Sequence, residues 1–324
     1  MTPRTALVVG GGVLGSACAH QLDRQGWSVT LIDAGGTPSA SVVAAGMLAP
    51  AFESVLDGAD AARVALLRHA RELWPAVSPH VVLHREGASW VGENPDEVLA
   101  ALLTLGFNAR EASGGVFTPD DWRLDPRRAL QALSRNVKRI TGRVEAVRPG
   151  GAHTAEGWLA ADLVVLASGA QAVTAPEAEP ALRAVTPVRG QIVGLAGVSP
   201  PHVLRGPGAY LAPTAGGVLV GASMEPGVRS LTPDRAVTQR LLQAGARMWP
   251  ALGMGSRAEV FVGVRGASPD GLPLAGPVAP GLSVALAPRR NGWLLAPLVA
   301  TIVAAYAAGD DPGPFAAAFH PLRF

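Results

Sequence analysis

The sequence predicts an α/β protein in which a parallel-sheet domain is interleaved with an α+β domain dominated by an antiparallel sheet. The first observation is an apolar run, 6–9, that ends on glycines and continues into a helical pattern. The second is a series of short strands with Gly and Pro turns over 185–220. The third is a return to strand, turn and helix from Leu282 onwards. A chain of 324 residues suits about two domains, so we expect the last segment to complete the first domain.

The first turn fits the dinucleotide-binding pattern G-x-G-x-x-G through Gly10, Gly12 and Gly15. In this pattern the first glycine makes a tight turn, the second lets the backbone approach a pyrophosphate, and the third lets helix pack on strand. A helix is predicted over 16–25, and a strand over 28–32 ends on Asp33, where the pattern places an acid for a ribose hydroxyl. These features predict a Rossmann-like unit holding NAD(P) or FAD. A glycine-rich strand-turn-helix without a ligand is the alternative.

The remaining helices, strands and loops are predicted from capping residues, hydrophobic periodicity and turn residues. Residues 35–39 form a loop by composition, 41–50 is expected to be a short buried helix, and 106–115 is expected to be irregular. Proline positions and capping residues predict four further helices, over 60–74, 94–105, 125–137 and 233–249. Alternating or continuous apolar runs predict strands over 81–90, 140–147, 158–167, 259–264 and 282–287.

The stretch 293–308 is the most apolar part of the C-terminal segment. It is shorter than the ~20 residues that a membrane-spanning helix needs, and it contains Pro297. We therefore expect a buried amphipathic helix and no membrane span. Residues 1–5 lead directly into the first strand without a leader pattern, so a cytoplasmic protein is expected.

Composition argues against several classes of partner and site. Residues are 48% hydrophobic and 16% charged, and 27 basic against 25 acidic residues leave a net charge of +2, which does not favour nucleic acid as a partner. The single cysteine, Cys18, is predicted to be a small buried side chain in the first helix and rules out an internal disulfide. The seven histidines show no metal-ligand spacing and no Ser/His/Asp arrangement, so no metal is expected.

Several motifs, running from end to end, carry a family resemblance. They are VVGGGVLGSACA, AAGMLAP (44–50), DPRRAL, ADLVVLASGA, PVRGQI (187–192), YLAP, GGVLVGASMEPG, VGVRGASPDGLPLAG (262–276), RRNGWLLAP (289–297) and HPLRF. In this order they resemble the FAD-dependent D-amino-acid oxidase superfamily, and within it the glycine oxidases of the thiamine-biosynthesis type. The glycine pattern is common to many nucleotide-binding enzymes, whereas AAGMLAP, PVRGQ and RNG-x-LLAP are more selective.

The resemblance implies non-covalent FAD as the cofactor. It implies a Rossmann-like FAD-binding domain formed by 1–80, 126–180 and 262–324, and a substrate-binding domain formed by 81–125 and 181–261. Residues near the pyrophosphate, the ribose, the adenine and the flavin are implied as follows: Gly10, Gly12, Val13, Leu14, Gly15, Asp33, Ala34, Ala40, Ser41, Ala45, Gly46, Met47, Val144, Gly169, Pro288, Arg289, Arg290, Asn291, Gly292, Trp293 and Leu294.

The expected catalytic residues are those that would bind a substrate carboxylate. A guanidinium binds a carboxylate through two parallel hydrogen bonds. Arg265 follows a predicted strand and is flanked by Gly263 and Gly266. The resemblance gives this role to Arg265, with the Tyr210 hydroxyl as a helper and Arg290 as a second candidate. Arg289 is expected to be solvated. Met224 lines the pocket or packs in the core, and core packing is favoured.

The implied reaction is oxidation of glycine, sarcosine and small D-amino acids. Hydride passes from substrate to FAD without an obligatory base, the imine is hydrolysed to a 2-oxo acid and ammonia or an amine, and dioxygen is reduced to hydrogen peroxide. Alternatives are a broader D-amino-acid oxidase, a flavin dehydrogenase with a non-oxygen acceptor, and a binding protein without catalysis. Two departures from the family, a changed turn at 287–290 and a short segment over 74–125, predict a more open pocket. The sequence leaves open whether the protein is a homo-oligomer.

Overall fold

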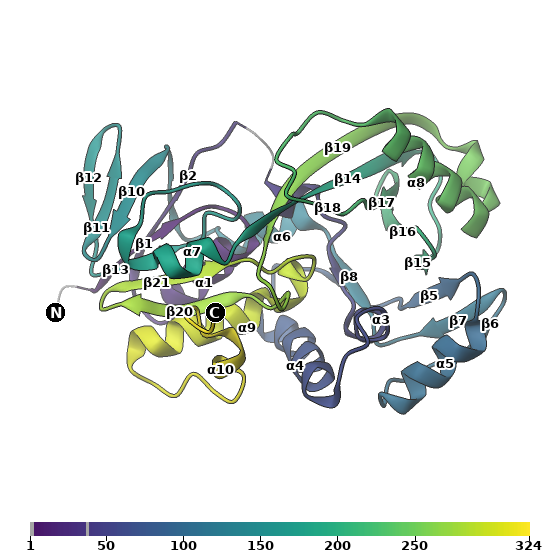
Figure 1. Cartoon of the computed structure of the whole chain (residues 1–324), viewed down its shortest axis with the longest axis horizontal. Coiled ribbons are helices and arrows are strands. Elements are labelled where there is room, and N and C mark those ends of the chain that lie inside the picture. Colours follow the sequence, from purple (N-terminus) through teal and green to yellow (C-terminus); the bar gives the residue numbers. More distant parts are fainter. Residues whose placement is uncertain (1–2, 37–38) are drawn as a thin grey trace.

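Two large β-sheets organise the chain in the computed structural model, which describes residues 3–36 and 39–324 (Figure 1). The first has the strand order β20-β21-β13-β1-β2-β9, and only the β20–β21 pair is antiparallel. Its strands are β1 (Thr5–Val9), β2 (Ser28–Asp33), β9 (Lys138–Thr141), β13 (Leu163–Leu166), β20 (Leu274–Ala279) and β21 (Leu282–Leu286). The C-terminal strands thus complete a sheet begun at the N-terminus, as predicted. Thr37 and Pro38 of the predicted loop lie outside the described residues.

The six-stranded sheet is buried on both faces because successive side chains of a strand point to opposite sides. Ala6 and Val8 join one hydrophobic core, and Leu7 and Val9 join another. The first core is formed with helices α1 (Val13–Arg24), α4 (Ala61–Val77), α6 (Pro126–Leu133), α9 (Gly292–Ala308) and α10 (Ala316–Phe319). The second core is formed with strands β10 (Val144–Arg148), β11 (Gly151–Thr154) and β12 (Gly157–Ala160), the 3-10 turn η1 (Pro176–Ala178) and helix α7 (Glu179–Arg183).

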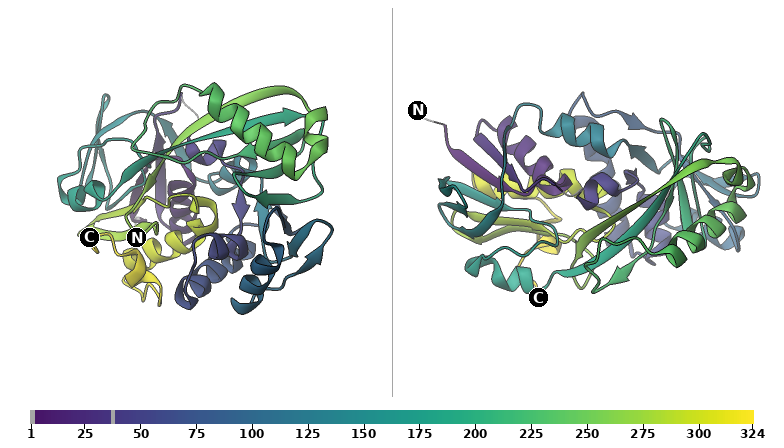
Figure 2. Two further views of the ribbon diagram at one scale, coloured as in Figure 1. Left: turned by 45° about the vertical axis from the view of Figure 1, so that its right-hand side comes forward. Right: turned by 90° about the horizontal axis from the view of Figure 1, so that it is seen from above.

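The second sheet has nine strands and is mainly antiparallel, and with it the predicted fold class is confirmed. Its strands are β5 (Ala88–Val91), β6 (Arg110–Ala112), β7 (Gly115–Thr118), β14 (Thr186–Ala196), β15 (Val203–Gly206), β16 (Ala209–Thr214), β17 (Gly217–Gly221), β18 (Glu225–Pro226) and β19 (Ser256–Ala267). The long strands β14 and β19 pair along most of their length and run from the middle of the molecule toward α8 (Arg235–Met248) in Figures 1 and 2. Helix α8 and the turn η2 (Pro250–Met254) cover one face, and α3 (Pro50–Leu56) and α5 (Pro95–Thr104) pack on the other.

The segment 41–50 is not the single short helix that was predicted. Helix α2 (Ala40–Val43) is one turn, and the chain then forms β3 (Met47–Leu48), which pairs with β8 (Trp122–Leu124); β4 (Leu83–His84) completes this small sheet. Gly46 makes the change of direction, with φ of +72°, and its carbonyl accepts a hydrogen bond from the Leu124 amide at 3.0 Å. A Cβ at Gly46 would lie 2.2 Å from the Leu124 carbonyl oxygen, so only glycine allows this pairing.

Other predicted elements had the right type but the wrong extent. The apolar run 140–147 is divided between β9 and β10, and the run 158–167 between β12 and β13, because each run passes from one sheet to another. The region 106–115 is not irregular, since β6 and the start of β7 form there. Helix α4 continues past Pro75 to Val77, and α6 ends at Leu133 rather than at 137. Periodicity detects these elements but does not locate where a strand changes sheets.

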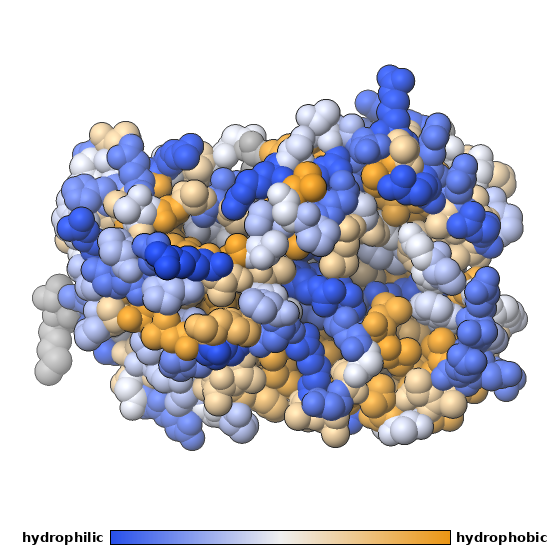
Figure 3. Space-filling view, in the orientation of Figure 1, coloured by the Kyte–Doolittle hydropathy of each residue, from blue (hydrophilic) through white to orange (hydrophobic). Residues whose placement is uncertain are grey.

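Helix α9 is apolar on nearly every side and is not amphipathic as predicted, because α1, α4, β20 and β21 surround it. Pro297 removes the amide that would bond to the Trp293 carbonyl, and the Trp74 Nε1–H donates to that oxygen at 3.0 Å instead. In the described part of the chain, no helix has the length and apolar character needed to cross a membrane. Figure 3 shows hydrophobic and hydrophilic residues interspersed on one face, with hydrophobic ones gathered over the region of α3, α4 and α5.

We expect Gly15→Ala to destabilise the protein although alanine favours helices. Helix propensity favours alanine over glycine by about 1 kcal/mol. However, a Cβ at position 15 would lie 2.0 Å from the Gly10 carbonyl oxygen, where backbone of the turn leaves no room. Overpacking of this kind costs about 1–3 kcal/mol, which should be measured as a lower free energy of unfolding in urea. Gly216→Ala is the control, because nothing lies within 4 Å of its added Cβ. Equal stability of the two variants would contradict a tight strand-helix contact.

Candidate active site

A cavity of about 330 Å³ lies between the nine-stranded sheet and the segments 40–56 and 288–293. It brings together the three predicted catalytic residues, Arg265, Tyr210 and Arg290. The predicted cofactor residues that line its wall come from the start of α1, from α2 and the segment after it, and from the turn before α9 with the first residues of that helix: Val13, Ala40, Ser41, Ala45, Gly46, Met47, Pro288, Arg289, Arg290, Asn291, Gly292 and Trp293. The others, Gly10, Gly12, Leu14, Gly15, Asp33, Ala34, Val144, Gly169 and Leu294, are not part of this wall, and Leu14, Val144 and Leu294 are buried in the hydrophobic cores.

One face of the nine-stranded sheet forms the floor of the cavity. Arg205 on β15 lies directly opposite Tyr210 on β16, and Tyr210 lies opposite Gly221 on β17, so the three share a face. A Cβ at Gly221 would lie 2.4 Å from the Tyr210 hydroxyl oxygen, and a Cβ at Gly190 would lie 2.2 Å from Arg265 Nη2. The tyrosine and the arginine therefore lie against bare backbone.

Arg265 differs from the other arginines of the cavity in having no acidic partner among the described residues. Its Nη2 donates one hydrogen bond, to the Ser223 carbonyl oxygen at 3.2 Å. Burial lowers the pKa of Arg265 from its ordinary value, but a guanidinium remains protonated at any physiological pH. Burial raises the pKa of Tyr210 to about 12, so its hydroxyl keeps its proton and can donate a hydrogen bond. Among the described residues the two side chains offer positive charge and hydrogen-bond donors without a carboxylate that would neutralise them.

The other arginines of the cavity belong to an ion cluster that the sequence analysis missed. Glu53 on α3 accepts a hydrogen bond from Arg205 Nη2 at 2.7 Å and another from Arg290 Nε. Asp57 pairs with Arg290 at 2.9 Å and with Arg289 at 3.5 Å. Burial opposes ionisation of Glu53, yet the two guanidinium groups outweigh it and lower the pKa of the carboxyl.

This cluster changes the interpretation of three residues. Arg289 is paired with Asp57 and its side chain is only 34% exposed, so the expectation of a solvated residue was wrong. Arg290 already has two carboxylate partners, which leaves Arg265 as the stronger candidate for a ligand carboxylate. Glu53 could have been noticed as the single acid in the apolar helix PAFESVL, and Arg205 as the single charge in the strand VLRG.

Met224 lines the cavity, although it was predicted to pack in the hydrophobic core. Its side chain belongs to the lining, and the residue is 39% exposed. The prediction failed because an isolated methionine gives no periodic signal that separates a core from a cavity rim.

A buried aspartate holds the helix that carries Glu53. The Asp121 carboxylate accepts hydrogen bonds from the amides of Ala51 at 2.7 Å and Phe52 at 3.2 Å, in the first turn of α3. Burial raises the pKa of Asp121 to about 7, with Arg205 acting in the opposite direction. The neutral form of Asp121 is therefore populated near neutral pH.

The glycine turn at the start of α1 has the features of a phosphate cradle. Gly10 has φ of +112°, and a Cβ there would lie 2.3 Å from the Ala167 carbonyl oxygen. Gly12 has no side chain that could cap the helix, no acidic residue occupies the first turn, and the Val13 amide donates to the Ser41 hydroxyl at 2.9 Å. A helix N-terminus of this kind attracts anions. The Asp33 carboxylate orders the turn by accepting from the Gly11 amide at 2.6 Å.

Comparisons with known proteins agree with this geometry. The protein family described as FAD dependent oxidoreductase (DAO) matches residues 5–306. The bifunctional protein ThiO/ThiG of Synechocystis sp. is 28% identical, in an alignment that covers 100% of this chain and 54% of that protein, so the chain spans about half the length of this relative. The glycine oxidase of Geobacillus kaustophilus is 28% identical over 92% of this chain and 91% of that protein. A solved structure of glycine oxidase from Geobacillus kaustophilus has a TM-score of 0.83 and 25% identity, and covers 99% of both chains.

We expect Glu53→Gln to destabilise the protein strongly. The carboxylate is 4% exposed and is held between two arginines, so its loss leaves buried positive charge without compensation. Removing one partner of a buried ion pair costs about 3–5 kcal/mol. Glu179→Gln is the matched control, since the Glu179–Arg183 pair is exposed and such pairs contribute only about 0–1 kcal/mol. Urea unfolding of both variants measures the difference, and a loss for Glu53→Gln no greater than for Glu179→Gln contradicts the cluster.

The raised pKa of Asp121 predicts a pH-dependent contribution to stability. The folded state holds its proton up to about pH 7, whereas the unfolded state releases it near the ordinary pKa of 3.8. This contribution is complete below the unfolded pKa and is lost as pH rises through the folded pKa. The stability of Asp121→Asn relative to wild type should therefore increase between about pH 4 and about pH 7 in urea unfolding, and stay level above that range. Asp162→Asn should show no such slope, because the pKa of Asp162 is lowered by its hydrogen bonds to Thr5. A flat difference for Asp121→Asn contradicts the assignment.

Proposed function

The chain belongs to the family of FAD-dependent oxidoreductases, and on that premise we propose that it oxidises glycine, sarcosine and small D-amino acids. The products are the 2-oxo acid, ammonia or an amine, and hydrogen peroxide formed from dioxygen. The observation that carries this proposal is the partly buried Arg265 guanidinium, which has no acidic partner among the described residues and lies in a cavity with the Tyr210 hydroxyl. The resemblance to glycine oxidases of the thiamine-biosynthesis type makes glycine the first substrate to test.

Arg265 and Tyr210 would bind the substrate carboxylate. A planar guanidinium makes charge-assisted hydrogen bonds to a carboxylate, and the protonated tyrosine adds another donor. Four arginines line the cavity, and Glu53 and Asp57 balance only two of these charges. The positive excess supports an anionic substrate.

The cofactor would occupy the part of the cavity nearest the glycine turn. Val13, the residues of 40–47 that line the cavity and the turn 288–293 would hold it. They fit a cofactor with phosphates because Val13 begins α1, and the cavity leaves space beside the N-terminus of this helix. FAD, when bound, accepts the two electrons that leave the Cα–H bond of the substrate. We propose that the FAD-binding and substrate-binding segments are divided as the sequence indicated, and that the enzyme is cytoplasmic.

The chain itself would contribute orientation rather than a catalytic base. No histidine is found among the described residues that line the cavity, and Glu53, its acid, is occupied by two arginines. Holding the carboxylate fixes where the Cα–H bond points, and correct orientation supplies up to roughly 7–11 kcal/mol in intramolecular models. This supports oxidation of the neutral amine without proton abstraction by a side chain.

We expect Arg265→Met to reduce kcat/KM for glycine by about 100-fold or more, since removing one partner of a charged hydrogen-bonded pair that becomes buried when the substrate binds costs about 2–5 kcal/mol. Tyr210→Phe should reduce it by about 10-fold, the equivalent of one hydrogen bond. The measurement is peroxide release from the purified holoenzyme with glycine, sarcosine, D-alanine, D-proline and bulkier D-amino acids. Arg183→Met, on an exposed helix, is the control.

Three results would contradict parts of this proposal. If Arg265→Met were as active as wild type, the carboxylate would bind elsewhere. If the substrates reduced the flavin but peroxide formed only slowly, and a quinone accepted the electrons instead, the enzyme would be a dehydrogenase. If none of these amines reduced the flavin, the substrate class would be wrong.

A further inference from the structure

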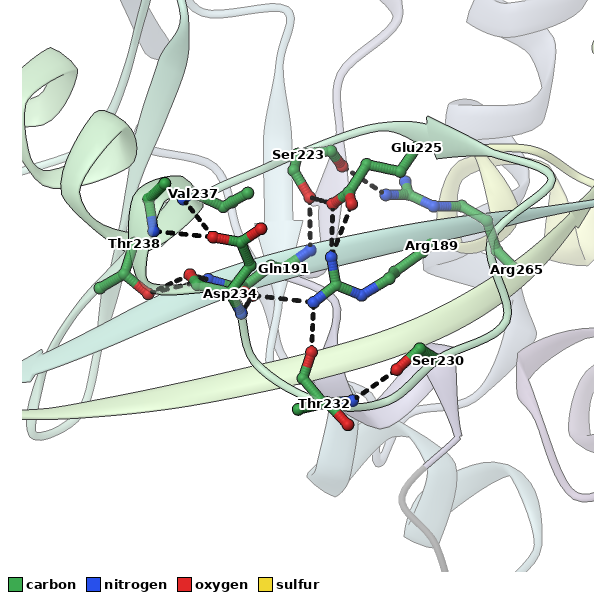
Figure 4. Close-up of polar contacts among 11 residues, drawn as sticks. Arg189, Gln191, Ser223, Glu225, Ser230, Thr232, Asp234, Val237, Thr238 and Arg265 are labelled. Atoms are coloured by element: carbon green, nitrogen blue, oxygen red, sulfur yellow. Dashed lines mark hydrogen bonds and ion pairs between the residues drawn. The ribbon is translucent and has the colours of Figure 1, made fainter.

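The motif PVRGQ on β14 contains two buried polar residues that the proposed reaction does not use. Arg189 is 3% exposed and Gln191 is 0% exposed, and neither lines the cavity. Side chains alternate along the strand, so Gly190 faces the cavity while Arg189 and Gln191 face the opposite side. Figure 4 shows both of them directed at the segment 223–238, which follows β17 and includes β18 and the first turn of α8.

Arg189 and Gln191 hold this segment at several points. Arg189 Nη1 donates to both carboxylate oxygens of Glu225, at 2.8 and 2.6 Å, and its Nη2 donates to the Thr232 carbonyl. The side-chain amide of Gln191 donates a hydrogen bond from Nε2 to the Asp234 carbonyl oxygen at 2.8 Å, and its Oε1 accepts one from the Asp234 backbone amide at 2.8 Å. A buried charge with so many bonds is fixed in one geometry.

The same network ends on the residue that binds Arg265. The backbone amide of Ser223 donates to the backbone carbonyl of Gln191 at 3.1 Å, and the Ser223 hydroxyl accepts from the backbone amide of Gln191 at 3.0 Å. That hydroxyl also donates to Glu225 Oε1 at 2.7 Å. Ser223 is therefore held by its backbone and its side chain, and its carbonyl oxygen is the acceptor of the Arg265 hydrogen bond.

Gly190 provides the second contact with Arg265. A Cβ at this position would lie 2.2 Å from Arg265 Nη2 and 3.3 Å from the Ser223 carbonyl oxygen. The guanidinium thus lies on bare backbone on one side and is bonded to a fixed carbonyl on the other. The Glu225 carboxylate, bound by Arg189 and Ser223, is already occupied and does not pair with Arg265.

We propose that Arg189, Gly190, Gln191, Ser223 and Glu225 are positioning residues that hold the Arg265 guanidinium in the orientation that binds the substrate carboxylate. This inference rests on the proposed function, because it assumes that Arg265 binds a carboxylate. The residues on the far face of β14 act through Ser223, whereas Gly190 acts by leaving space. The motif PVRGQ thereby acquires a role in substrate binding without touching the substrate.

The test measures the binding of glycolate to the oxidised holoenzyme, and the change in flavin absorption reports how much glycolate is bound. Glycolate carries the carboxylate of glycine with a hydroxyl in place of the amine, and a flavin spectrum that stays oxidised shows that binding is measured without turnover. We expect Glu225→Gln and Ser223→Ala to weaken glycolate binding about 10-fold, or about 1.4 kcal/mol, and Arg265→Met to weaken it about 100-fold. Glu179→Gln, the same change in an exposed ion pair, should leave binding unchanged.

Coupling distinguishes positioning from general structural support. Because Glu225 acts through Arg265, adding Glu225→Gln to Arg265→Met should weaken binding by less than about 2-fold further. In turnover, Glu225→Gln should raise KM for glycine about 10-fold, because the carboxylate is bound more weakly, and should lower kcat as well, because the carboxylate orients the Cα–H bond. If Glu225→Gln does not fold, Ser223→Ala, which removes only one hydroxyl, carries the same test.

The two proposals fail in different ways. If Arg265→Met binds glycolate as tightly as wild type, the proposed function is wrong and the positioning role is wrong with it. If Arg265→Met weakens binding but Glu225→Gln and Ser223→Ala do not, the positioning role alone is overturned. It is also overturned if Glu225→Gln weakens binding equally with and without Arg265, because the network then acts only on the fold.

Discussion

Among the described residues Arg265 has no acidic partner, and this is the constraint on which the site depends. Removing a guanidinium even partly from water without an acid is unfavourable, and each of the other three arginines of the cavity has Glu53 or Asp57 as a partner. Arg265 has one neutral acceptor, the Ser223 carbonyl. In the proposed function a substrate carboxylate supplies the missing partner, so the cost of desolvating this charge becomes selectivity for a carboxylate. The paired arginines serve a different purpose, since they tie α3 to β15 and to the turn before α9.

Strand β14 connects the two sides of this arrangement. Its glycine lets Arg265 lie on the backbone in the cavity, and its arginine and glutamine hold the segment 223–238 on the other face. A strand has opposite faces by geometry, and here each face has a separate function. The floor of the cavity is therefore as rigid as the hydrogen-bonded sheet to which it belongs.

Elements with strong local signals could be predicted from the sequence. The helices beginning after Asp60, Asp125 and Asp234 start where expected, because each aspartate accepts hydrogen bonds from amides of the first turn. The predictions that failed concern small apolar residues. The segment 41–50 has the same composition whether it is a helix or a helix turn followed by a strand, and the run 140–147 does not reveal that its two halves belong to different sheets. The ion pair between Glu53 and Arg290 could not be predicted from the sequence either, because the two residues are 237 positions apart.

The sequence by itself determined the nucleotide-binding unit and the alternation of parallel and antiparallel regions, because a glycine turn, a capped helix or an alternating strand is visible within a few residues. Arg265 and Tyr210 became candidates for substrate binding through the resemblance of their motifs to a known family. Only the tertiary structure decided which arginine has no acidic partner among the described residues, which carboxylates neutralise the others, and what the polar residues of PVRGQ hold. The physical reason is that an ion pair depends on which distant segments the fold brings within hydrogen-bonding distance, and the type of a residue does not specify its partner.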